Sequence, residues 1–413
     1  MRVLVLTQYY LPEQVGAAIW IAQLAADLVA AGHQVTVLTS FPNHPDGVIP
    51  PPYRGKVFQR EISGGVRVVR TYIYPTPSRA FWPRVLTFGS FIFSSLVGGA
   101  LSIPAHDVIY AILPPLPLGV TAVLLARLKS ARLILNLQDI YPDIAVSTGV
   151  LRNKPAIRFF QGLEKWIYRR AACLLVVSEG FRQNLTSKGV PEAKIRVIPN
   201  WADPDSIRPQ FDAELRREWG GGNFAVVYSG AVSHNSTLEP LLAAAGALRD
   251  APFKFIICGE GVKKAGLQAA VREKGLENVC FRPYAPLDRY AAVLSTADMN
   301  VVTLHPAAAS SSAPSKIYKM MAAGRPVLAI APPESEIARL VSAAQCGICV
   351  SPNQPEELAA ALRHAATHRA EIDQMGAQGR SYLQQHHGRR LCTAQINRTL
   401  LEVAEAGEGA HAR

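Results

Sequence analysis

The first forty residues, MRVLVLTQYYLPEQVGAAIWIAQLAADLVAAGHQVTVLTS (residues 1–40), contain a complete strand–helix–strand pattern. Residues 2–8 and 34–40 are short and almost continuously apolar, which is typical of strands that are buried on both faces of a parallel sheet. Between them, residues 16–31 carry apolar side chains at helical spacing, and Gly32 ends this run. The stretch therefore predicts a βαβ unit and, with it, an α/β fold.

This alternation continues along the chain and pauses once. In the first half we expect further strands at residues 66–74, 107–113, 132–137 and 172–178, and helices at 118–130 and 154–171. Residues 200–223 are polar and contain two prolines and three consecutive glycines, which indicates a linker. Beyond it we expect strands at 224–229, 253–258, 279–282, 300–304, 326–330 and 347–350, and C-terminal helices from 355 to 405. The pattern predicts two doubly wound α/β domains, whose ligands bind at the carboxyl ends of the strands.

Length and composition restrict the class of protein. The chain has 413 residues, of which 49% are hydrophobic, so it can bury domain cores and is not disordered. The six cysteines are scattered, which favours a reducing compartment over a disulfide scaffold. The histidines show no metal-ligand spacing, so we expect neither a metal site nor a cofactor. The sequence opens without a signal-peptide pattern, and a cytoplasmic protein is expected.

Positive charge is concentrated in the first half of the chain. Residues 1–200 contain 21 Lys and Arg against 10 Asp and Glu, a net charge of +11, whereas residues 201–413 contain 22 against 21, a net charge of +1. This asymmetry indicates that one domain meets nucleic acid, an anionic membrane surface or phosphate-bearing substrates. Because RNP, KH, helix-turn-helix and zinc-finger patterns are missing from the sequence, we expect no nucleic acid partner.

Residues 85–105 form an uncharged, largely apolar stretch that follows Arg79 and Arg84. Three interpretations are open. A transmembrane span is the weakest, because the stretch contains serines, glycines and a proline and lies inside the strand–helix alternation. The stretch can also be a buried helix of the first domain, or a monotopic helix whose flanking arginines contact anionic headgroups. The excess of positive charge favours the monotopic helix, with residues 79–105 as the membrane contact.

Two residues of the first half follow the carboxyl ends of expected strands, where ligands bind in doubly wound domains. Gly16 lies at the start of the first expected helix, where a glycine lets a phosphate approach backbone N–H groups, although a glycine for close packing is an equal alternative. Asp139 follows the strand at residues 132–137, where it can accept a hydrogen bond from a substrate hydroxyl or act as a base. An N-cap or loop aspartate is the competing interpretation of Asp139.

The second half contains the sharper indication of an anion site. Pro314, Ser315 and Lys316 open an expected helix, with Pro314 at its first position. A lysine opposes the helix dipole at an amino terminus, so Lys316 is best explained by a bound phosphate group. We discount Asp203-Pro-Asp205 as a turn rather than a metal motif, and the Cys346–Cys349 pair as buried thiols rather than a redox pair.

Several segments occur in the order and spacing of a known family. They are YYLPEQVGAAIWIAQLAADLVAAGHQVTVLTSFPNHP, NLQDIYPDIAVSTGVL, VVSEGF, KIRVIPNWAD, VVYSGAVSHNSTLEPLLAAA, FIICGEG and APSKIYKMMAAGRPVLA, which begin at residues 9, 136, 176, 194, 226, 255 and 313. Together they resemble the family 4 glycosyltransferases with the GT-B fold, over nearly the whole chain. Within that family the bacterial enzymes of exopolysaccharide, O-antigen and colanic-acid assembly are the most similar.

The resemblance implies two Rossmann-like domains that face each other across a cleft. Residues 1–203 would bind the acceptor and residues 204–387 the nucleotide sugar, and a C-terminal helix at 388–413 would cross back to the first domain. The implied reaction is a metal-independent, retaining transfer of a hexosyl or N-acetylhexosaminyl group. The donor would be a nucleoside-diphosphate sugar, with UDP favoured over GDP as its nucleotide.

The resemblance also implies roles for individual residues. Gly16 would lie beside the donor diphosphate, and Tyr284 near the base. The diphosphate and sugar would be lined by Gly230, Glu260, Pro314, Ser315 and Lys316. Lys316 would stabilise the departing diphosphate in a front-face substitution, and Asp139 would orient or assist at the reacting centre.

The chain departs from the family pattern at two places. Two glutamates eight positions apart are replaced by Ser311 and Lys319, and a basic pair is replaced by residues 231–234. Recognition of the ribose and phosphate would therefore depend on other groups, such as Tyr318 or His234. The donor's identity does not follow from the family for this reason.

The acceptor and the location follow from the apolar stretch together with the family. A polyprenyl-diphosphate-linked saccharide suits a basic domain with an apolar segment, and the protein would be peripheral or monotopic on the inner face of the cell membrane. Two alternatives stay open: a non-hydrolysing nucleotide-sugar epimerase with the same architecture, and a non-catalytic nucleotide-sugar-binding or scaffold subunit.

Overall fold

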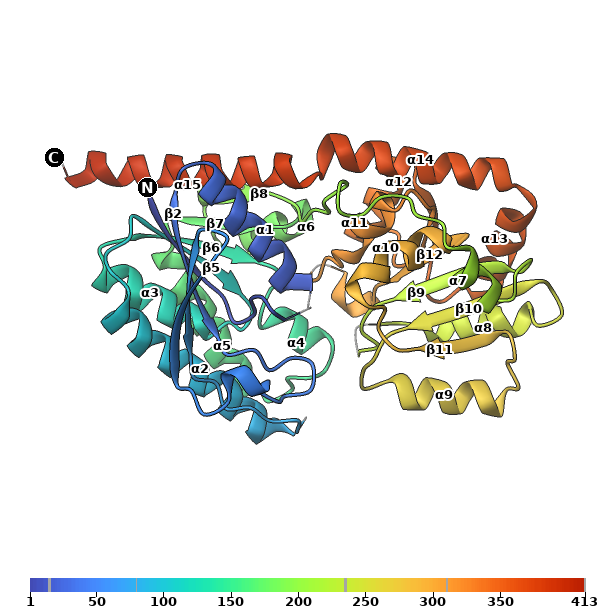
Figure 1. Ribbon diagram of the computed structural model, residues 1–413, viewed down its shortest axis with the longest axis horizontal. Coiled ribbons are helices and arrows are strands. Elements are labelled where there is room, and N and C mark those ends of the chain that lie inside the picture. The colour runs from blue at the N-terminus through green and yellow to red at the C-terminus, as the bar shows by residue number, and fades with distance from the viewer. Residues whose placement is uncertain (14–15, 79, 234–235, 310, 412–413) are drawn as a thin grey trace. The chain divides into compact units, whose positions relative to one another are not determined.

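The computed structural model describes residues 1–13, 16–78, 80–233, 236–309 and 311–411 (Figure 1). The chain divides into two compact units. The first contains Met1–Val146, Leu151–Pro199 and Arg390–Arg413, and the second contains Ser147–Val150 and Asn200–Arg389. Each unit is built around one sheet with helices packed on it. The predicted α/β class is confirmed.

The first unit contains an eight-stranded sheet with the order β3-β4-β2-β1-β5-β6-β7-β8. Its strands are β1 (Arg2–Leu6), β2 (Gln34–Ser40), β3 (Phe58–Ser63), β4 (Val66–Thr71), β5 (Val108–Leu113), β6 (Arg132–Leu137), β7 (Cys173–Val176) and β8 (Ile195–Val197). Neighbouring strands are parallel except β3 and β4, which form an antiparallel pair. The central strands β1, β5 and β6 are buried along almost their whole length, as expected for a sheet covered on both faces.

Helices connect the strands of the first unit. They are α1 (Gly16–Ala30), α2 (Phe81–Ser102), α3 (Leu118–Leu128), α4 (Asp143–Ser147), α5 (Lys154–Arg170) and α6 (Glu179–Ser187), with short 3₁₀ turns at Pro51–Tyr53 and Glu192–Lys194. Capping side chains fix two of the starts. The Asn153 side chain accepts the N–H of Ala156 before α5, and that of Ser178 accepts the N–H of Phe181 before α6.

The second unit contains a six-stranded, fully parallel sheet with the order β11-β10-β9-β12-β13-β14. Its strands are β9 (Phe224–Ser229), β10 (Phe253–Cys258), β11 (Val279–Arg282), β12 (Met299–Thr303), β13 (Val327–Ile330) and β14 (Gly347–Val350). Its helices are α7 (Ala213–Glu218), α8 (Glu239–Ala247), α9 (Lys264–Glu273), α10 (Leu287–Thr296), α11 (Lys316–Ala322), α12 (Glu336–Ala344), α13 (Pro355–Thr367) and α14 (Arg369–His386), with a 3₁₀ turn at Pro306–Ala308. The strand order reverses between β9 and β12, and ligands bind beside such a reversal in doubly wound sheets.

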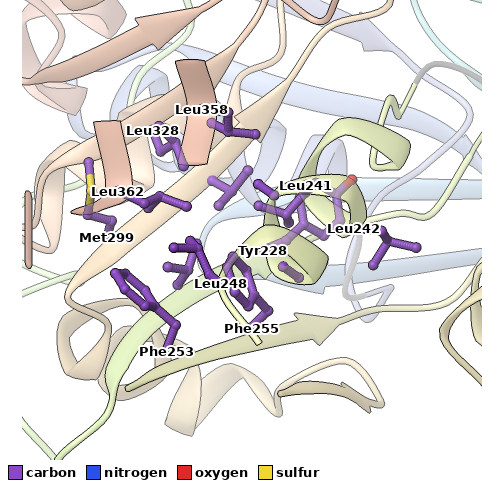
Figure 2. Packing of buried hydrophobic residues seen from close by; sticks show 14 of the residues in the cluster. Tyr228, Leu241, Leu242, Leu248, Phe253, Phe255, Met299, Leu328, Leu358 and Leu362 are labelled. Atoms are coloured by element: carbon purple, nitrogen blue, oxygen red, sulfur yellow. The ribbon is translucent and has the colours of Figure 1, made fainter. Parts of the chain in front are cut away.

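One face of this second sheet packs into a large apolar core. Tyr228 of β9 and Phe255 of β10 point into the same cluster as Leu241 and Leu242 of α8 (Figure 2). Leu358 of helix α13 packs into the same cluster. Because β9 and β10 are held from this side, the loops that follow their carboxyl ends start from rigid positions.

Several segments differ from the sequence-based expectation, among them the short elements α4, α6 and β8, which were not predicted. The stretch 200–223 is not a free linker: it belongs to the second unit and contains α7, whose Leu215, with Trp219 just after it, is buried in a core cluster. Asp212 begins α7 because its side chain accepts the N–H groups of Glu214 and Leu215. Strand β3 was not predicted, because its side chains are largely exposed and lack the continuous apolar run of the buried strands.

The C-terminal helix α15 (Arg389–His411) returns to the first unit, as predicted. Thr393 Oγ1 donates to Asp27 Oδ2 at 2.9 Å, and His33 Nε2 lies 2.7 Å from Asn397 Oδ1. These contacts attach the helix to α1 and to the turn that follows it. The chain therefore begins and ends in the same unit.

The apolar stretch of the sequence forms α2, and the interpretation as a buried core helix is wrong. Within the described residues, Trp82–Ser102 is long and apolar enough to cross a membrane, yet only 17% of its most apolar window is buried. Phe91 is fully buried against the sheet, whereas Trp82, Phe93 and Leu101 are 72%, 69% and 83% exposed. One face of α2 therefore packs on the protein and the other presents large apolar side chains.

Candidate functional site

The loops after β9 and β10 lie against each other at the carboxyl edge of the second sheet. The backbone N–H of Gly230 donates to the carbonyl of Cys258 at 2.9 Å, and that of Val232 donates to the carbonyl of Glu260 at 2.9 Å. A Cβ on Gly259 would lie 1.9 Å from the Gly230 carbonyl oxygen, and Gly259 has a φ of +159°. This position therefore requires glycine, which lets the two loops approach closely beside the reversal of strand order.

Lys316 presents its ammonium group at this edge. Its Nζ lies 3.9 Å from the centre of the Tyr228 ring, and a Cβ on Gly230 would lie 3.2 Å from Nζ. The ring's negative face attracts the cation, and no carboxylate pairs with Lys316 within the described part of the chain. The ammonium group consequently retains its capacity to bind an anion.

The structure shifts the start of the helix that carries Lys316. The sequence predicted that Pro314 opens it, but α11 begins at Lys316. Ser315 is the N-cap of α11, where its carbonyl accepts the Tyr318 N–H at 3.3 Å, so Pro314 precedes the helix. Pro314 and Ser315 therefore adjoin Lys316 as the end of a loop rather than as a first helical turn.

Glu260 and Tyr284 meet on the neighbouring loops. The Tyr284 hydroxyl donates to the Glu260 carbonyl at 3.2 Å, and 41% of the Tyr284 side chain is exposed. The Glu260 carboxylate pairs with Lys264 Nζ at 2.5 Å. An exposed aromatic ring such as that of Tyr284 can stack on a planar ligand, and the Lys264 charge offsets the charge of Glu260.

The structure does not bring Tyr318 to Lys316. The side chain of Tyr318 is buried, and its ring centre lies 4.9 Å from that of His387, which follows α14. Tyr318 is two residues along the helix from Lys316 and therefore points to a different face. His234, the other candidate for ribose or phosphate recognition, lies outside the described residues.

Lys319 and Ser311, the residues at the two departures from the family pattern, have unusual surroundings. Burial lowers the pKa of Lys319, whose Nζ lies 5.3 Å from the centre of the Tyr290 ring and has no carboxylate partner among the described residues. The Ser311 hydroxyl is buried and makes no hydrogen bond within the same set of residues. Both groups belong to the segment that carries Lys316, and both retain polar capacity for a ligand.

The carboxyl edge of the first sheet carries a buried carboxylate that the sequence analysis missed. Glu13 is 4% exposed and accepts the N–H groups of Asn43 and His44, both at 3.0 Å. Burial raises its pKa, and these hydrogen bonds oppose the rise. Glu13 thus ties the loop after β1 to the loop after β2. A single acidic residue in the strand-to-helix loop at residues 7–15 was the available signal.

Arg70 is a second buried charged residue at the same edge of the sheet. It is 2% exposed and donates to the carbonyls of Leu11 and Ser40 at 2.5 and 3.4 Å, while its guanidinium pairs with Glu61 at 2.7 Å. The cation therefore bridges the loop after β1, the end of β2 and strand β3. Its role is to hold the edge in shape.

Asp139 follows the end of β6 at this edge, as predicted, and is partly buried. Burial is the main cause of the raised pKa of Tyr141; the negative charge of Asp139 raises it further and Arg84 lowers it. Burial also raises the pKa of Tyr9 to about 12, and Arg84 again opposes the rise. Arg84 therefore acts on both tyrosines, whereas Asp139 acts on Tyr141 and Glu13 on Tyr9. Gly16 begins α1, and its predicted contact with the donor stays a prediction.

The remaining motifs have structural explanations. Asp203 accepts the N–H groups of Asp205 and Ser206 in a turn and pairs with Arg389 at 3.0 Å. Cys346 is a buried free thiol whose pKa is raised to about 12 by burial. Among the described residues no three His, Cys, Asp or Glu side chains are grouped so that they could hold a metal ion.

Comparison with family models covers most of the chain. Residues 15–201 match the model described as “Glycosyl transferase 4-like domain”, and residues 223–368 match “Glycosyl transferases group 1”. The chain is 28% identical over 383 residues to “Putative colanic acid biosynthesis glycosyl transferase WcaI” of Escherichia coli (strain K12), which covers 88% of this chain and 92% of that protein. It is 27% identical over 290 residues to “Probable glycosyltransferase WbjE” of Pseudomonas aeruginosa, covering 68% and 71%.

Solved structures share the architecture. Sucrose-phosphate synthase from Thermosynechococcus elongatus superposes with a TM-score of 0.79 at 18% identity, covering 98% of this chain and 99% of that one. Anabaena Alr3699/HepE in complex with UDP-glucose gives a TM-score of 0.72 at 16% identity, covering 97% and 100%. At this level of identity the likeness concerns the fold, and the predicted GT-B architecture is confirmed.

Proposed function

The chain belongs to the family 4 glycosyltransferases, and we propose that it moves a sugar from a nucleoside-diphosphate donor to a lipid-linked saccharide during assembly of a bacterial surface polysaccharide. The observation that carries this proposal is Lys316, a cation without a carboxylate partner in the described chain, held on the Tyr228 ring beside Gly230. Such a group attracts the diphosphate of a donor and stabilises it as it leaves. The similarity to WcaI supports the polysaccharide context.

The donor site belongs to the second unit in this proposal. Lys316 binds the diphosphate, and the exposed ring of Tyr284 stacks on the nucleotide base. We favour UDP as the nucleotide, and the description of HepE with UDP-glucose supports this choice. Lys319 and Ser311 supply the polar contacts to ribose and sugar at the places where the family carries glutamates.

The reaction that we propose retains the configuration of the sugar. The bond between the sugar's anomeric carbon and the diphosphate oxygen breaks, and the acceptor oxygen bonds to the same face of that carbon. The acceptor's hydroxyl proton passes to the departing phosphate oxygen, so charge and atoms balance. Lys316 stabilises the negative charge that develops on the leaving group, which is the task a metal ion performs in other transferases. We therefore propose that turnover is insensitive to a chelator.

The acceptor site belongs to the first unit in this proposal. Asp139 lies at the carboxyl edge of the sheet, where it orients the attacking hydroxyl, and Glu13 holds the two loops that border that edge. The apolar face of α2 supports a lipid-linked acceptor, because it presents Trp82, Phe93 and Leu101 to the surroundings. We propose that this face rests in the inner leaflet, which makes the protein a peripheral membrane enzyme in the cytoplasm.

Transfer assays with purified protein, membrane extracts and labelled UDP-sugars test the function. Lys316→Ala is expected to lower kcat by about 100-fold, the usual cost of removing one group that stabilises a transition state. The matched control is Lys274→Ala, which removes an exposed lysine beyond α9 and should leave turnover unchanged. Full activity of Lys316→Ala would refute the proposed role of Lys316.

The assays also separate the alternative functions. Conversion of the nucleotide sugar to an epimer in the absence of acceptor would identify an epimerase. Binding of UDP without transfer to any acceptor would identify a non-catalytic subunit. Transfer that continues in the presence of a chelator supports the proposed mechanism.

A further inference from the structure

The loop that carries Asp139 joins β6 to the short helix α4, and both of its ends are held in place. At its start, the N–H of Gln138 donates to the carbonyl of Leu113 at 2.9 Å, which continues the hydrogen bonding of the sheet. At its end, the N–H of Ile144 in α4 donates to the carbonyl of Ile140 at 3.0 Å. The position of Asp139 therefore depends on the position of α4.

Helix α4 has only five residues, too few to be stable without contacts to the rest of the protein. Its first residue, Asp143, makes such contacts through both carboxylate oxygens. Oδ2 accepts a hydrogen bond from Asn184 Nδ2 at 2.9 Å, and Oδ1 pairs with Lys188 Nζ at 2.9 Å. Asn184 belongs to α6, and Lys188 directly follows that helix. The start of α4 is therefore held by α6 and by the residue after it.

Lys188 also binds a buried carboxylate of a third helix. Its Nζ lies 2.8 Å from Glu164 Oε1, and Glu164, which belongs to α5, is 4% exposed. Burial raises the pKa of Glu164, Lys188 lowers it, and the negative charge of Asp143 raises it further. Among the residues that the structure describes, no other cation pairs with either carboxylate. Removal of Lys188 would therefore leave two carboxylates close enough to repel each other.

A cavity of about 650 Å³ adjoins these ion pairs. Lys188 and Glu164 both line it, together with Lys165 of α5. The side chain of Lys165 is exposed and makes no ion pair within the described chain. A small soluble amine can consequently reach the place of the Lys188 ammonium group once that side chain is shortened, and Lys165 provides a matched control from the same wall of the cavity.

We propose that Lys188 is a positioning residue of the transfer reaction: by binding Asp143 it fixes α4 and, through α4, the loop from which Asp139 acts on the acceptor. This role rests on the proposed function, in which Asp139 orients the attacking hydroxyl. The contact with Glu164 ties α4 to the long helix α5. A displacement of about 1 Å near reacting groups can lower a rate by up to about 100-fold, so a small shift of α4 is enough to be measured.

The test follows sugar transfer, UDP binding and amide hydrogen exchange in Lys188→Ala and in the control Lys165→Ala. We expect Lys188→Ala to lower kcat by about tenfold or more, and to leave UDP affinity unchanged because the proposed donor site belongs to the second unit. Backbone amides between residues 140 and 146 should exchange faster with solvent. Lys165→Ala should match the wild type in all three measurements. A wild-type kcat, or wild-type exchange in this segment, for Lys188→Ala would overturn the proposal.

Chemical rescue separates positioning from a general loss of structure. Propylammonium replaces the three carbons and the ammonium group that Lys188→Ala removes. Propylammonium chloride should therefore restore part of the kcat of Lys188→Ala, whereas potassium chloride at the same ionic strength should not. An equal effect of the two salts would contradict the proposal.

Asp143→Ala keeps the proposal falsifiable if Lys188→Ala does not fold. This substitution removes the contact with α4 and leaves Lys188 paired with Glu164, so no carboxylate loses its counter-ion. We expect the same loss of kcat, again with unchanged UDP affinity. Transfer by the wild type that Asp143→Ala leaves unchanged would overturn only the positioning role, whereas absence of transfer by the wild type would contradict the proposed function itself.

Discussion

At the scale of single residues, the carboxyl edge of the second sheet depends on backbone atoms that approach too closely for a side chain at Gly259. An anion-binding role of Lys316 could be predicted from the sequence, because a lysine at the start of a helix opposes the helix dipole unless an anion is bound. The contact of the Lys316 ammonium group with the Tyr228 ring could not be predicted, because it joins β9 to α11 and depends on the strand order. The contact of Tyr318 with His387 could not be predicted either, because the sequence does not tell which face of so short a helix packs against α14.

Gly259 provides the sharpest prediction at this scale. Gly259→Ala places a Cβ 1.9 Å from the Gly230 carbonyl oxygen and also strains a φ of +159°. We expect the free energy of unfolding to fall by about 2–4 kcal/mol, and UDP affinity to fall with it, because the paired loops must separate. Denaturant titration measures the first effect and calorimetry the second.

A second alanine substitution serves as the control. Gly266 lies within α9, and a Cβ there would meet no atom within 4 Å. Gly266→Ala should therefore raise stability by up to about 1 kcal/mol through helix propensity. If both substitutions lowered the free energy of unfolding, the close approach of the two loops would not explain the effect of Gly259→Ala.

At the scale of elements, the alternation of apolar runs predicted every central strand of both sheets, because buried parallel strands leave a continuous signal. Strands β3 and β8 were not predicted, because the side chains of both are mostly exposed, and α7 was not predicted because prolines and glycines flank it. For α2 the sequence left three interpretations open. The structure excludes the interpretation as a buried core helix, because most of the apolar side chains of α2 are exposed. The sequence does not distinguish the exposed face of α2 from the buried one.

Helix α2 yields a paired prediction, since Phe91 is 0% exposed and Phe93 is 69% exposed. Phe93→Ser should change the free energy of unfolding by less than about 0.5 kcal/mol in solution but weaken binding to vesicles. Phe91→Ser should lower stability by at least about 3 kcal/mol. Thermal unfolding and vesicle co-sedimentation measure the two quantities. Unchanged vesicle binding of Phe93→Ser would show that this face of α2 does not enter a membrane.

At the scale of the whole molecule, the sequence places nearly all of the excess positive charge in the first half of the chain. The contacts of Lys188 with Asp143 and Glu164 could not be predicted, because the three residues come from three separate segments of the chain. The same holds for the surroundings of His387, which follows α14 and lies against Tyr318 and Tyr382.

His387 predicts how stability depends on pH. Burial, assisted by His386, lowers its pKa from 6.5 to about 4. The unfolded chain therefore binds a proton that the folded chain does not, between about pH 6.5 and about pH 4. The free energy of unfolding therefore has its full value above about pH 6.5, where His387 is neutral in both states. Below that pH it falls by at most about 1.4 kcal/mol per pH unit.

Replacement of the imidazole tests this dependence. Denaturant unfolding of His387→Phe should lose part of the acid sensitivity, because phenylalanine fills the site without binding a proton. His386→Phe removes only the neighbouring charge that assists the shift, so its slope should change less than that of His387→Phe. Identical slopes for His387→Phe and the wild type would exclude His387 as the source of the acid sensitivity.

The central claim, a diphosphate site built around Lys316, is tested most directly by calorimetric titration of the wild type and of Lys316→Ala with UDP, first with a chelator and then with magnesium. The account predicts that the wild type binds UDP equally well in both conditions and that Lys316→Ala binds about tenfold or more weakly, as expected for loss of a charged contact to phosphate. Binding of UDP by Lys316→Ala with wild-type affinity, or binding by the wild type only with magnesium, would contradict it.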